Sequence, residues 1–253
     1  MKRRELLVGA GRWGTGSAFG SLLANAPGLS LASSPDRKLK MVVAGGHPGD
    51  AEYGCGGTIA RYSGLGHEVV LLHLNNGVRP TGTTPAQVRL DEANKAAGIL
   101  KARAVFVGQT TGQAIQDATH FDAFRSILEK ETPDLVFTQW PIDQHRDHRA
   151  ISALAFDAWL QLGKKFALFY YEVTNGADTL QFSPTHYVDI TEMEPTKHAA
   201  CYSYASITPD KFYAIQDQVA KFRGIESGYQ RAEAYVMQVQ SPYVALPVLG
   251  HLP

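Results

Sequence analysis

The sequence is poor in cysteine and has no long apolar run, and both shortages narrow the class of protein. Its 253 residues contain two cysteines, Cys55 and Cys201, which are too few for a disulfide framework and lack zinc-finger spacing. No apolar run reaches the roughly 18 residues that a membrane span requires. Basic and acidic residues both number 24, so no charge excess indicates binding to nucleic acid or an anionic membrane. What remains is a globular chain, long enough for one large domain.

The first 34 residues differ in composition from the rest. The basic residues 2–4 (KRR) precede a weakly apolar stretch rich in glycine and serine, which resembles a twin-arginine export signal. The same stretch contains GxGxxG at Gly9, Gly11 and Gly14, the pattern of a dinucleotide-binding turn, but that motif alone is weakly specific. We therefore expect an export signal at 1–34, a linker at 35–39 and the folded domain at 40–253, in a periplasmic or extracellular protein.

From residue 40 onward, short apolar runs alternate with helical patterns. Strands are expected at 40–46, 67–75, 103–108, 134–140, 164–173 and 185–190. Helices are expected at 57–66, 86–101, 119–133 and 208–227, and after the loop at 141–150 through about Leu160. This alternation predicts right-handed crossovers, and therefore an α/β fold with a mainly parallel sheet.

Two loops rich in histidine and aspartate follow the first and fourth of these strands. The first, "HPGD", carries His47 and Asp50, and the second is "DQHRDH", with Asp143, His145, Asp147 and His148. Ligands of open α/β sheets bind beyond the carboxyl ends of the strands, so the two loops can meet. Two imidazoles and a carboxylate would leave one zinc position open, which is the catalytic arrangement. Each loop alone has a plainer explanation as hydrogen-bonded or solvated chain, but their joint occurrence favours a metal.

The segments "GGHPGDAEYGCGGT" and "HRDHRA" resemble the two motifs of the PIG-L/LmbE-like N-deacetylases, zinc enzymes that remove acetyl groups from N-acetylglucosamine-type substrates. Arg89 with Glu92, Lys197 and residues 223–235 also match segments of that family, so the resemblance covers about residues 40 to 240. It implies a Rossmann-like three-layer sandwich with the metal site at the carboxyl ends of the strands. It further implies zinc bound by His47, Asp50 and His148, and a catalytic His145 with Asp147 as its partner.

Position 49 departs from the family's pattern. The family has HPDD, in which the first aspartate is the general base, whereas this chain has Gly49. Asp143, Asp147, Glu52 or His145 could replace the base, or zinc alone could activate water. The third alternative is that the protein binds zinc and a sugar but does not hydrolyse the sugar's amide. General base catalysis typically contributes about 10²–10⁴-fold, so the loss matters. We expect a zinc-dependent hydrolase that deacetylates an N-acetylated amino sugar or glycoconjugate, with a non-catalytic, zinc-containing carbohydrate-binding protein as the alternative.

The expected partner is a small-molecule or glycan substrate, and the oligomeric state stays open. Asn76 and Arg79 follow the second strand at the same sheet edge, and with Asp143 they are the predicted substrate contacts. Arg79 has the alternative of facing solvent. Trp140, directly before the second loop, could stack on a sugar ring or belong to the core.

Overall fold

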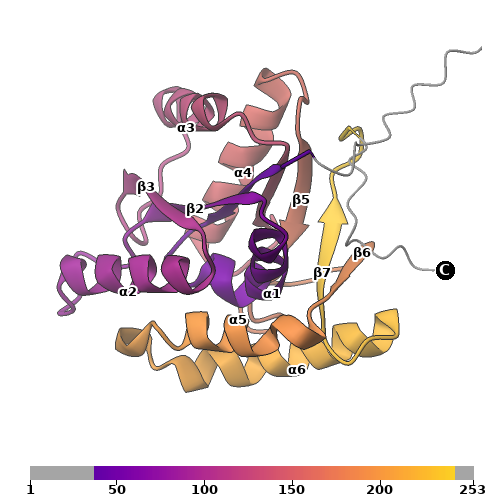
Figure 1. Ribbon diagram of the computed structural model, residues 1–253. Helices are drawn as coiled ribbons and strands as arrows, with labels where there is room; N and C mark the ends of the chain where they lie inside the picture. Colours follow the sequence, from indigo (N-terminus) through magenta and orange to yellow (C-terminus); the bar gives the residue numbers. More distant parts are fainter. Residues whose placement is uncertain (1–36, 243–253) are drawn as a thin grey trace, which may run out of the picture. The chain divides into compact units, whose positions relative to one another are not determined.

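The computed structural model describes residues 37–242 (Figure 1). The predicted export signal, the GxGxxG segment and the start of the linker lie outside the described residues. Within 37–242, no helix is both long enough and apolar enough to span a membrane.

A seven-stranded sheet forms the middle layer of the domain (Figure 1). The strands are β1 Lys40–Gly45, β2 Glu68–Asn75, β3 Arg103–Gln109, β4 Leu135–Gln139, β5 Ala167–Tyr171, β6 His186–Asp189 and β7 Ala232–Met237. Their order is β3-β2-β1-β4-β5-β7-β6, and β1 to β5 pair in parallel while β7 is antiparallel to both β5 and β6. The predicted mainly parallel sheet is confirmed, and β7 is the strand that the sequence pattern missed.

Helices cover both faces of this sheet (Figure 1). They are α1 Asp50–Gly64, α2 Ala86–Ile99, α3 Ala118–Glu131, α4 Arg146–Gln161, α5 Glu194–Cys201 and α6 Pro209–Ser227, with 3₁₀ turns at Thr191–Met193 and Ala205–Ile207. Met41 and Val43 of β1 belong to the core shared with α1, α2, α5 and α6, whereas Val42 and Ala44 belong to the core shared with α3 and α4. Because β1 is buried on both faces, it shows a continuous apolar run. The three-layer α/β sandwich is confirmed.

Helix α1 begins at Asp50. The glycine-rich sequence had predicted a start at residue 57, which is wrong. Gly54, Gly56 and Gly57 lie inside the helix because neighbouring elements leave no room for side chains at these positions. A Cβ on Gly54 would lie 2.3 Å from Cδ2 of Tyr171, and one on Gly57 would lie 2.5 Å from Cβ of Ile190. Close packing, and not a turn, therefore explains these glycines, and it places Asp50 in the first turn of a helix.

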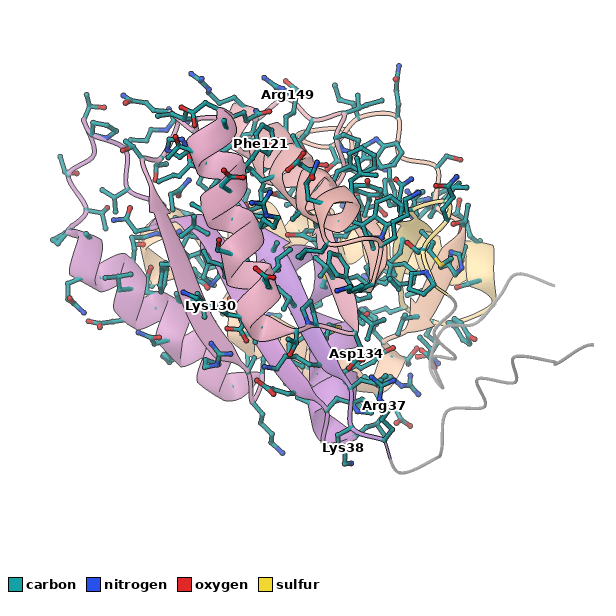
Figure 2. The ribbon with its side chains drawn as sticks, turned by 90° about the horizontal axis from the view of Figure 1, so that it is seen from above. Arg37, Lys38, Phe121, Lys130, Asp134 and Arg149 are labelled. Carbon is teal, nitrogen blue, oxygen red and sulfur yellow. The ribbon has the colours of Figure 1, made fainter. Side chains whose placement is uncertain are left out.

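The two histidine-rich loops follow neighbouring strands at the centre of the sheet. The chain continues from β1 to one side and from β4 to the other, so the β1/β4 boundary is the switch point where such folds bind ligands. The Gln139 side-chain oxygen at the end of β4 accepts a hydrogen bond from the Gly46 N–H at 2.8 Å, which ties the loops together. Figure 2 shows the opposite ends of the domain: Arg37 and Asp134 form an ion pair at the amino-terminal edge, far from Arg149.

Candidate metal centre

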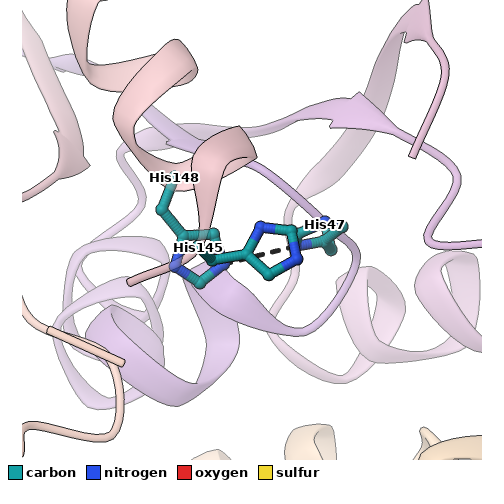
Figure 3. Close-up of side chains that lie close together, drawn as sticks. All are labelled: His47, His145 and His148. Carbon is teal, nitrogen blue, oxygen red and sulfur yellow. Dashed lines mark hydrogen bonds between the residues drawn. The ribbon is translucent and has the colours of Figure 1, made fainter. Parts of the chain in front are cut away.

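Three histidines converge beyond the carboxyl ends of β1 and β4 (Figure 3). His47 comes from the loop after β1, and His145 and His148 come from the start of α4. One ring nitrogen of each lies within 4.8 Å of the others, a grouping that could hold a metal ion. The sequence prediction that the two loops meet is therefore supported by their position.

Asp50 completes a tighter group with two of these histidines. Nδ1 of His47 lies 3.2 Å from Oδ2 of Asp50, Nε2 of His148 lies 3.3 Å from the same oxygen, and the two nitrogens are 3.3 Å apart. Tetrahedral zinc, with bonds of about 2.0–2.2 Å, holds its ligand atoms about 3.3–3.6 Å apart. These three atoms have the separations of a tridentate zinc site, so the donor set fits the metal that the sequence predicts.

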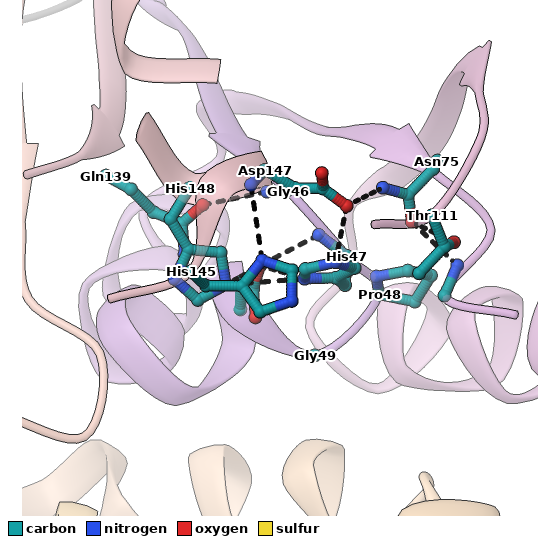
Figure 4. A network of polar contacts seen from close by, with 12 residues as sticks. Gly46, His47, Pro48, Gly49, Asn75, Thr111, Gln139, His145, Asp147 and His148 are labelled. Atoms are coloured by element: carbon teal, nitrogen blue, oxygen red, sulfur yellow. Dashed lines mark hydrogen bonds and ion pairs between the residues drawn. The ribbon is translucent and has the colours of Figure 1, made fainter. Parts of the chain in front are cut away.

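The outer nitrogen of each of these two histidines is bound to a buried carboxylate, and Figure 4 shows the contact between His47 and Asp147. Nε2 of His47 lies 3.0 Å from Oδ2 of Asp147, and Nδ1 of His148 lies 3.0 Å from Oδ1 of Asp143. A carboxylate accepts the proton of the outer nitrogen, so the inner nitrogens of neutral histidines keep their lone pairs for a metal. Asp143, predicted to contact substrate, is buried and instead holds His148.

His145 has a different environment, which argues against it as the third ligand. It caps the N-terminus of α4, and its Nδ1 accepts a hydrogen bond from the Asp147 N–H at 3.2 Å. A neutral imidazole that accepts at Nδ1 carries its proton on Nε2, so that nitrogen is a donor and has no lone pair for a metal. The hydrogen bond between Asp147 and His145 uses the Asp147 backbone N–H, whereas the Asp147 carboxylate is bonded to His47.

Burial and charge shift the pKa values in this cluster strongly. Burial would raise the pKa of Asp147, but hydrogen bonds from His47 and the Gly112 N–H lower it to about 2. Burial would lower the pKa of His148, but the negative charge of Asp50 and the bond to Asp143 raise it to about 10. The pKa of His145 is lowered by burial and by the neighbouring His47 and His148. Both effects favour the neutral form of the His145 ring.

Gly49 has a backbone conformation that few other residues adopt. Its φ of 111° and ψ of −38° place it outside the regions open to residues with a Cβ. Its N–H donates to Oε2 of Glu52 at 3.2 Å, and Oε1 of Glu52 accepts from the Tyr204 hydroxyl at 2.5 Å. Burial raises the pKa of Glu52 to about 7, despite the bond from Tyr204.

A cavity of about 590 Å³ opens in front of the cluster. Its wall includes His47, Gly49, Asp50, His145 and His148, and also Tyr53, Arg79, Arg89, Thr111, Asp178, Ser206 and Phe212. Of the four acceptors considered as replacements for the base, His145 alone lines it; Asp143, Asp147 and Glu52 are held by other partners behind the wall. The carboxylates in the wall are Asp50 and Asp178.

Of the predicted substrate contacts Asn76 and Arg79, one lies in the cavity wall and the other does not. Arg79 lines the cavity, whereas the Asn76 side-chain oxygen accepts from the Val78 N–H in a local turn and lines no part of it. Trp140 packs edge-to-face against Tyr170 and Phe182, so it belongs to the core.

Three supporting residues were not anticipated in these roles. Asn75 donates from Nδ2 to Asp147 at 3.1 Å, and Nη2 of Arg89 donates to the Pro48 carbonyl at 2.9 Å, which ties α2 to the metal loop. Asp178 enters the cavity from the loop after β5. The position of Asn75 at a strand end was a usable signal for it, but nothing local marks Asp178.

The fold and the cluster define an α/β protein with a pocket at its switch point that is suited to a metal. Residues 42–159 match the family described as "PIG-L: GlcNAc-PI de-N-acetylase", which is the family that the two histidine-rich segments resemble.

Proteins of known activity or structure are also similar to this chain. The diacetylchitobiose deacetylase of Thermococcus kodakarensis is 26% identical over 222 residues, covering 74% of this chain and 78% of that protein. The conserved protein TT1542 of Thermus thermophilus superposes with a TM-score of 0.72 at 27% identity, over 81% of this chain and 97% of that one. The N,N'-diacetylchitobiose deacetylase of Pyrococcus horikoshii has the same fold, with a TM-score of 0.68 at 22% identity over 81% and 87% of the two chains.

Proposed function

We propose that the protein is a zinc-dependent hydrolase that removes the acetyl group from an N-acetylated amino sugar or glycoconjugate. The observation that carries the proposal is the triangle of His47 Nδ1, Asp50 Oδ2 and His148 Nε2, with sides of 3.2–3.3 Å, at the wall of the cavity. The family and the deacetylase relatives support the reaction class. Tyr53 and Phe212, whose ring centroids are 6.3 Å apart, offer an apolar wall for a sugar ring.

His47, Asp50 and His148 would hold the metal. When bound there, zinc would supply Lewis acidity, which polarises an amide carbonyl and lowers the pKa of water. Asp147 and Asp143 keep the two imidazoles in the tautomer that presents a lone pair inward. The Gln139–Gly46 bond and the Arg89–Pro48 bond fix the loop that carries His47.

His145 is the hydrogen-bond donor of the proposed reaction. It lines the cavity, and because its Nδ1 is occupied by the Asp147 N–H, its Nε2–H is left to donate a hydrogen bond to the carbonyl oxygen of the amide. In the hydrolysis, the water oxygen bonds to the acetyl carbon, the C–N bond breaks, and the nitrogen takes the proton that the base has removed from the water. The products are acetate and the free amine.

Asp178 is our proposed replacement for the base missing at position 49. It is the one carboxylate of the described cavity wall that does not belong to the proposed ligand set. Its Oδ2 accepts from the Thr174 hydroxyl, which leaves Oδ1 for a proton from water. Asp178→Asn is expected to lower kcat by about 10²–10⁴-fold without changing zinc content, whereas an unchanged kcat would remove Asp178 from the mechanism.

The non-catalytic alternative is favoured by Gly49 alone. A zinc-containing carbohydrate-binding protein would keep the three ligands and bind sugars without releasing acetate. Gly49→Asp would then create activity, and Gly49→Asn is its matched control, since both must adopt a positive φ and only aspartate can accept the proton.

The deciding experiment measures acetate release by the zinc-loaded full chain from N-acetylglucosamine, N,N'-diacetylchitobiose and larger N-acetylated glycoconjugates. We expect acetate from at least one of them, and its loss in His145→Ala at unchanged zinc content. His120→Ala is the control, because His120 lies on α3 and lines no part of the cavity. If no substrate yields acetate while diacetylchitobiose binds, the non-catalytic alternative replaces our proposal.

We also propose that the chain is exported, on the strength of its twin-arginine-like N-terminus. Cell fractionation tests this proposal: replacing both Arg3 and Arg4 by lysine should retain the protein in the cytoplasm. An unchanged distribution would contradict it.

A further inference from the structure

A second cavity of about 440 Å³ adjoins the first. The two share Arg79, Thr111 and His145 in their walls. The remaining wall of the second cavity is formed by Gly112, Gln113, Gln144, Arg146 and the turn at 80–81. A molecule whose amide reaches His145 can therefore extend past it into this second space.

The second cavity carries positive charge without compensation. Arg79 and Arg146 both line it, no aspartate or glutamate does, and among the described residues neither guanidinium has an ion pair or hydrogen bond. Their neighbours differ: Arg89 bonds to Glu92 and to the Pro48 carbonyl, and Arg149 bonds to the Asp143 and Gln144 carbonyls. Two arginines in this part of the chain are thus committed to the scaffold, and two are left at the cavity.

We propose that this second cavity binds an anionic substituent, a carboxylate or a phosphate, of the amino sugar whose acetyl amide lies at the metal centre. The proposal rests on the proposed function. Guanidinium groups match carboxylate and phosphate oxygens with paired, charge-assisted hydrogen bonds. Side chains of Gln113 and Thr81 in the same wall offer further donors, and the preferred substrate is therefore an acidic sugar derivative, not a neutral chitin fragment.

Gly49 agrees with this charge preference. An aspartate at position 49 would add a negative charge to the wall of the first cavity, which an anionic substrate must enter. With glycine there, the described walls of the two cavities contain two arginines without an ion pair, Arg79 and Arg146, against the carboxylates of Asp50 and Asp178, and a metal would neutralise Asp50.

Product binding tests the subsite without requiring turnover. Calorimetry on the zinc-loaded full chain would compare glucosamine with glucosamine 1-phosphate, glucosamine 6-phosphate and muramic acid. We expect at least one anionic amine to bind about 10-fold or more tightly than glucosamine, with the ratio collapsing towards one in Arg79→Gln and in Arg146→Gln. Arg125→Gln, on α3 and outside both cavities, should keep the wild-type ratio.

Three results would overturn the inference: no anionic preference in wild type, a preference that survives in both arginine variants, or inorganic phosphate that binds as tightly as the best sugar phosphate. The last would mark a site for free anions. Acetate release from the N-acetylated forms of the same compounds separates this inference from the proposed function. An anionic preference without acetate release refutes the deacetylase and keeps the subsite, whereas acetate release without a preference refutes the subsite alone.

Discussion

Two buried clusters of charged side chains contact helix α1. Both contain carboxylates and basic side chains, but the carboxylate of one has a full set of hydrogen-bond donors, whereas the other has the arrangement of a metal site. In the first, Lys197 Nζ lies 2.6 Å from Glu233 Oε1, which also accepts from the Gly57 N–H at 2.9 Å. The other oxygen of Glu233 accepts from the Thr58 N–H at 2.8 Å and the Tyr235 hydroxyl at 3.1 Å. Every oxygen of this carboxylate has donors, so the cluster is complete by itself.

The metal centre is incomplete by the same criterion. His47 and His148 give their outer protons to Asp147 and Asp143, and their inner nitrogens face each other and Asp50 at 3.2–3.3 Å. Burial lowers the pKa of both His47 and His148, but the negative charge of Asp50 contributes to a net rise of both pKa values, so the group favours added positive charge. A cluster that needs added cations can bind a metal, whereas a saturated one only stabilises the fold.

The largest expected effect comes from removing a ligand of the incomplete cluster. His148→Ala should lose stoichiometric zinc and all acetate release, because a two-ligand site holds zinc poorly. Zinc per chain, measured by elemental analysis beside circular dichroism, checks this. A variant that keeps both zinc and fold would remove His148 from the proposed ligand set.

Breaking the saturated cluster should affect stability and leave zinc stoichiometry intact. Lys197→Met leaves the Glu233 carboxylate buried without its cation, which typically costs about 3–5 kcal/mol. Denaturant unfolding measures the loss, and the zinc content of the folded fraction should stay near wild type. Zinc loss at unchanged stability would show that the two clusters are not separate in function.

Asp147→Asn tests the support behind the metal. The amide keeps the shape of the carboxylate but accepts less strongly from His47, so zinc affinity should fall about 10–100-fold. Competition with a chelator gives the affinity. Asp157→Asn, on the same helix and outside both cavities, should match wild type; equal affinities in all three proteins would contradict the role of Asp147.

Two glycines of α1, Gly54 and Gly64, differ in the room around them, so alanine substitutions at the two positions test how tightly the helix packs. Gly54→Ala places a Cβ against Tyr171 and should destabilise the fold by about 1–3 kcal/mol, as overpacking does. Gly64→Ala has open space around its Cβ and should be neutral or stabilising by up to about 1 kcal/mol. The difference between the two midpoints in denaturant is the measurement, and equal midpoints would show that α1 shifts to make room.

The last expected effect, which needs no substitution, is on the pH dependence of zinc binding. Since the pKa of His148 is raised to about 10 without metal, zinc must displace a proton at neutral pH. Affinity should therefore rise about tenfold per pH unit for each proton displaced and level off above pH 10. Calorimetry in buffers with different heats of ionisation counts the protons, and a count of zero would contradict the assignment.

Much of the fold was readable from the sequence because β1 to β5 are short apolar runs between helical patterns. The strand β7 escaped because "AEAYVM" contains a buried glutamate, and only the folded structure shows that Glu233 reaches α1. The start of α1 was misplaced because glycine marks both turns and close contacts, and the neighbours that distinguish them lie far away in sequence.

The sequence alone determined that histidines and aspartates follow two strands of a parallel sheet, and parallel strands bring their carboxyl ends to one edge. It also determined that position 49 has no side chain to act as a base. Only the tertiary structure decided that Asp147 holds His47, across 100 residues, and that Asp178 enters the cavity. The same holds for Arg79 and Arg146 beside His145, whose guanidiniums have no ion pair among residues 37–242. The physical reason is that periodic burial specifies local elements, whereas hydrogen-bond partners across the sheet depend on the loops that packing brings together.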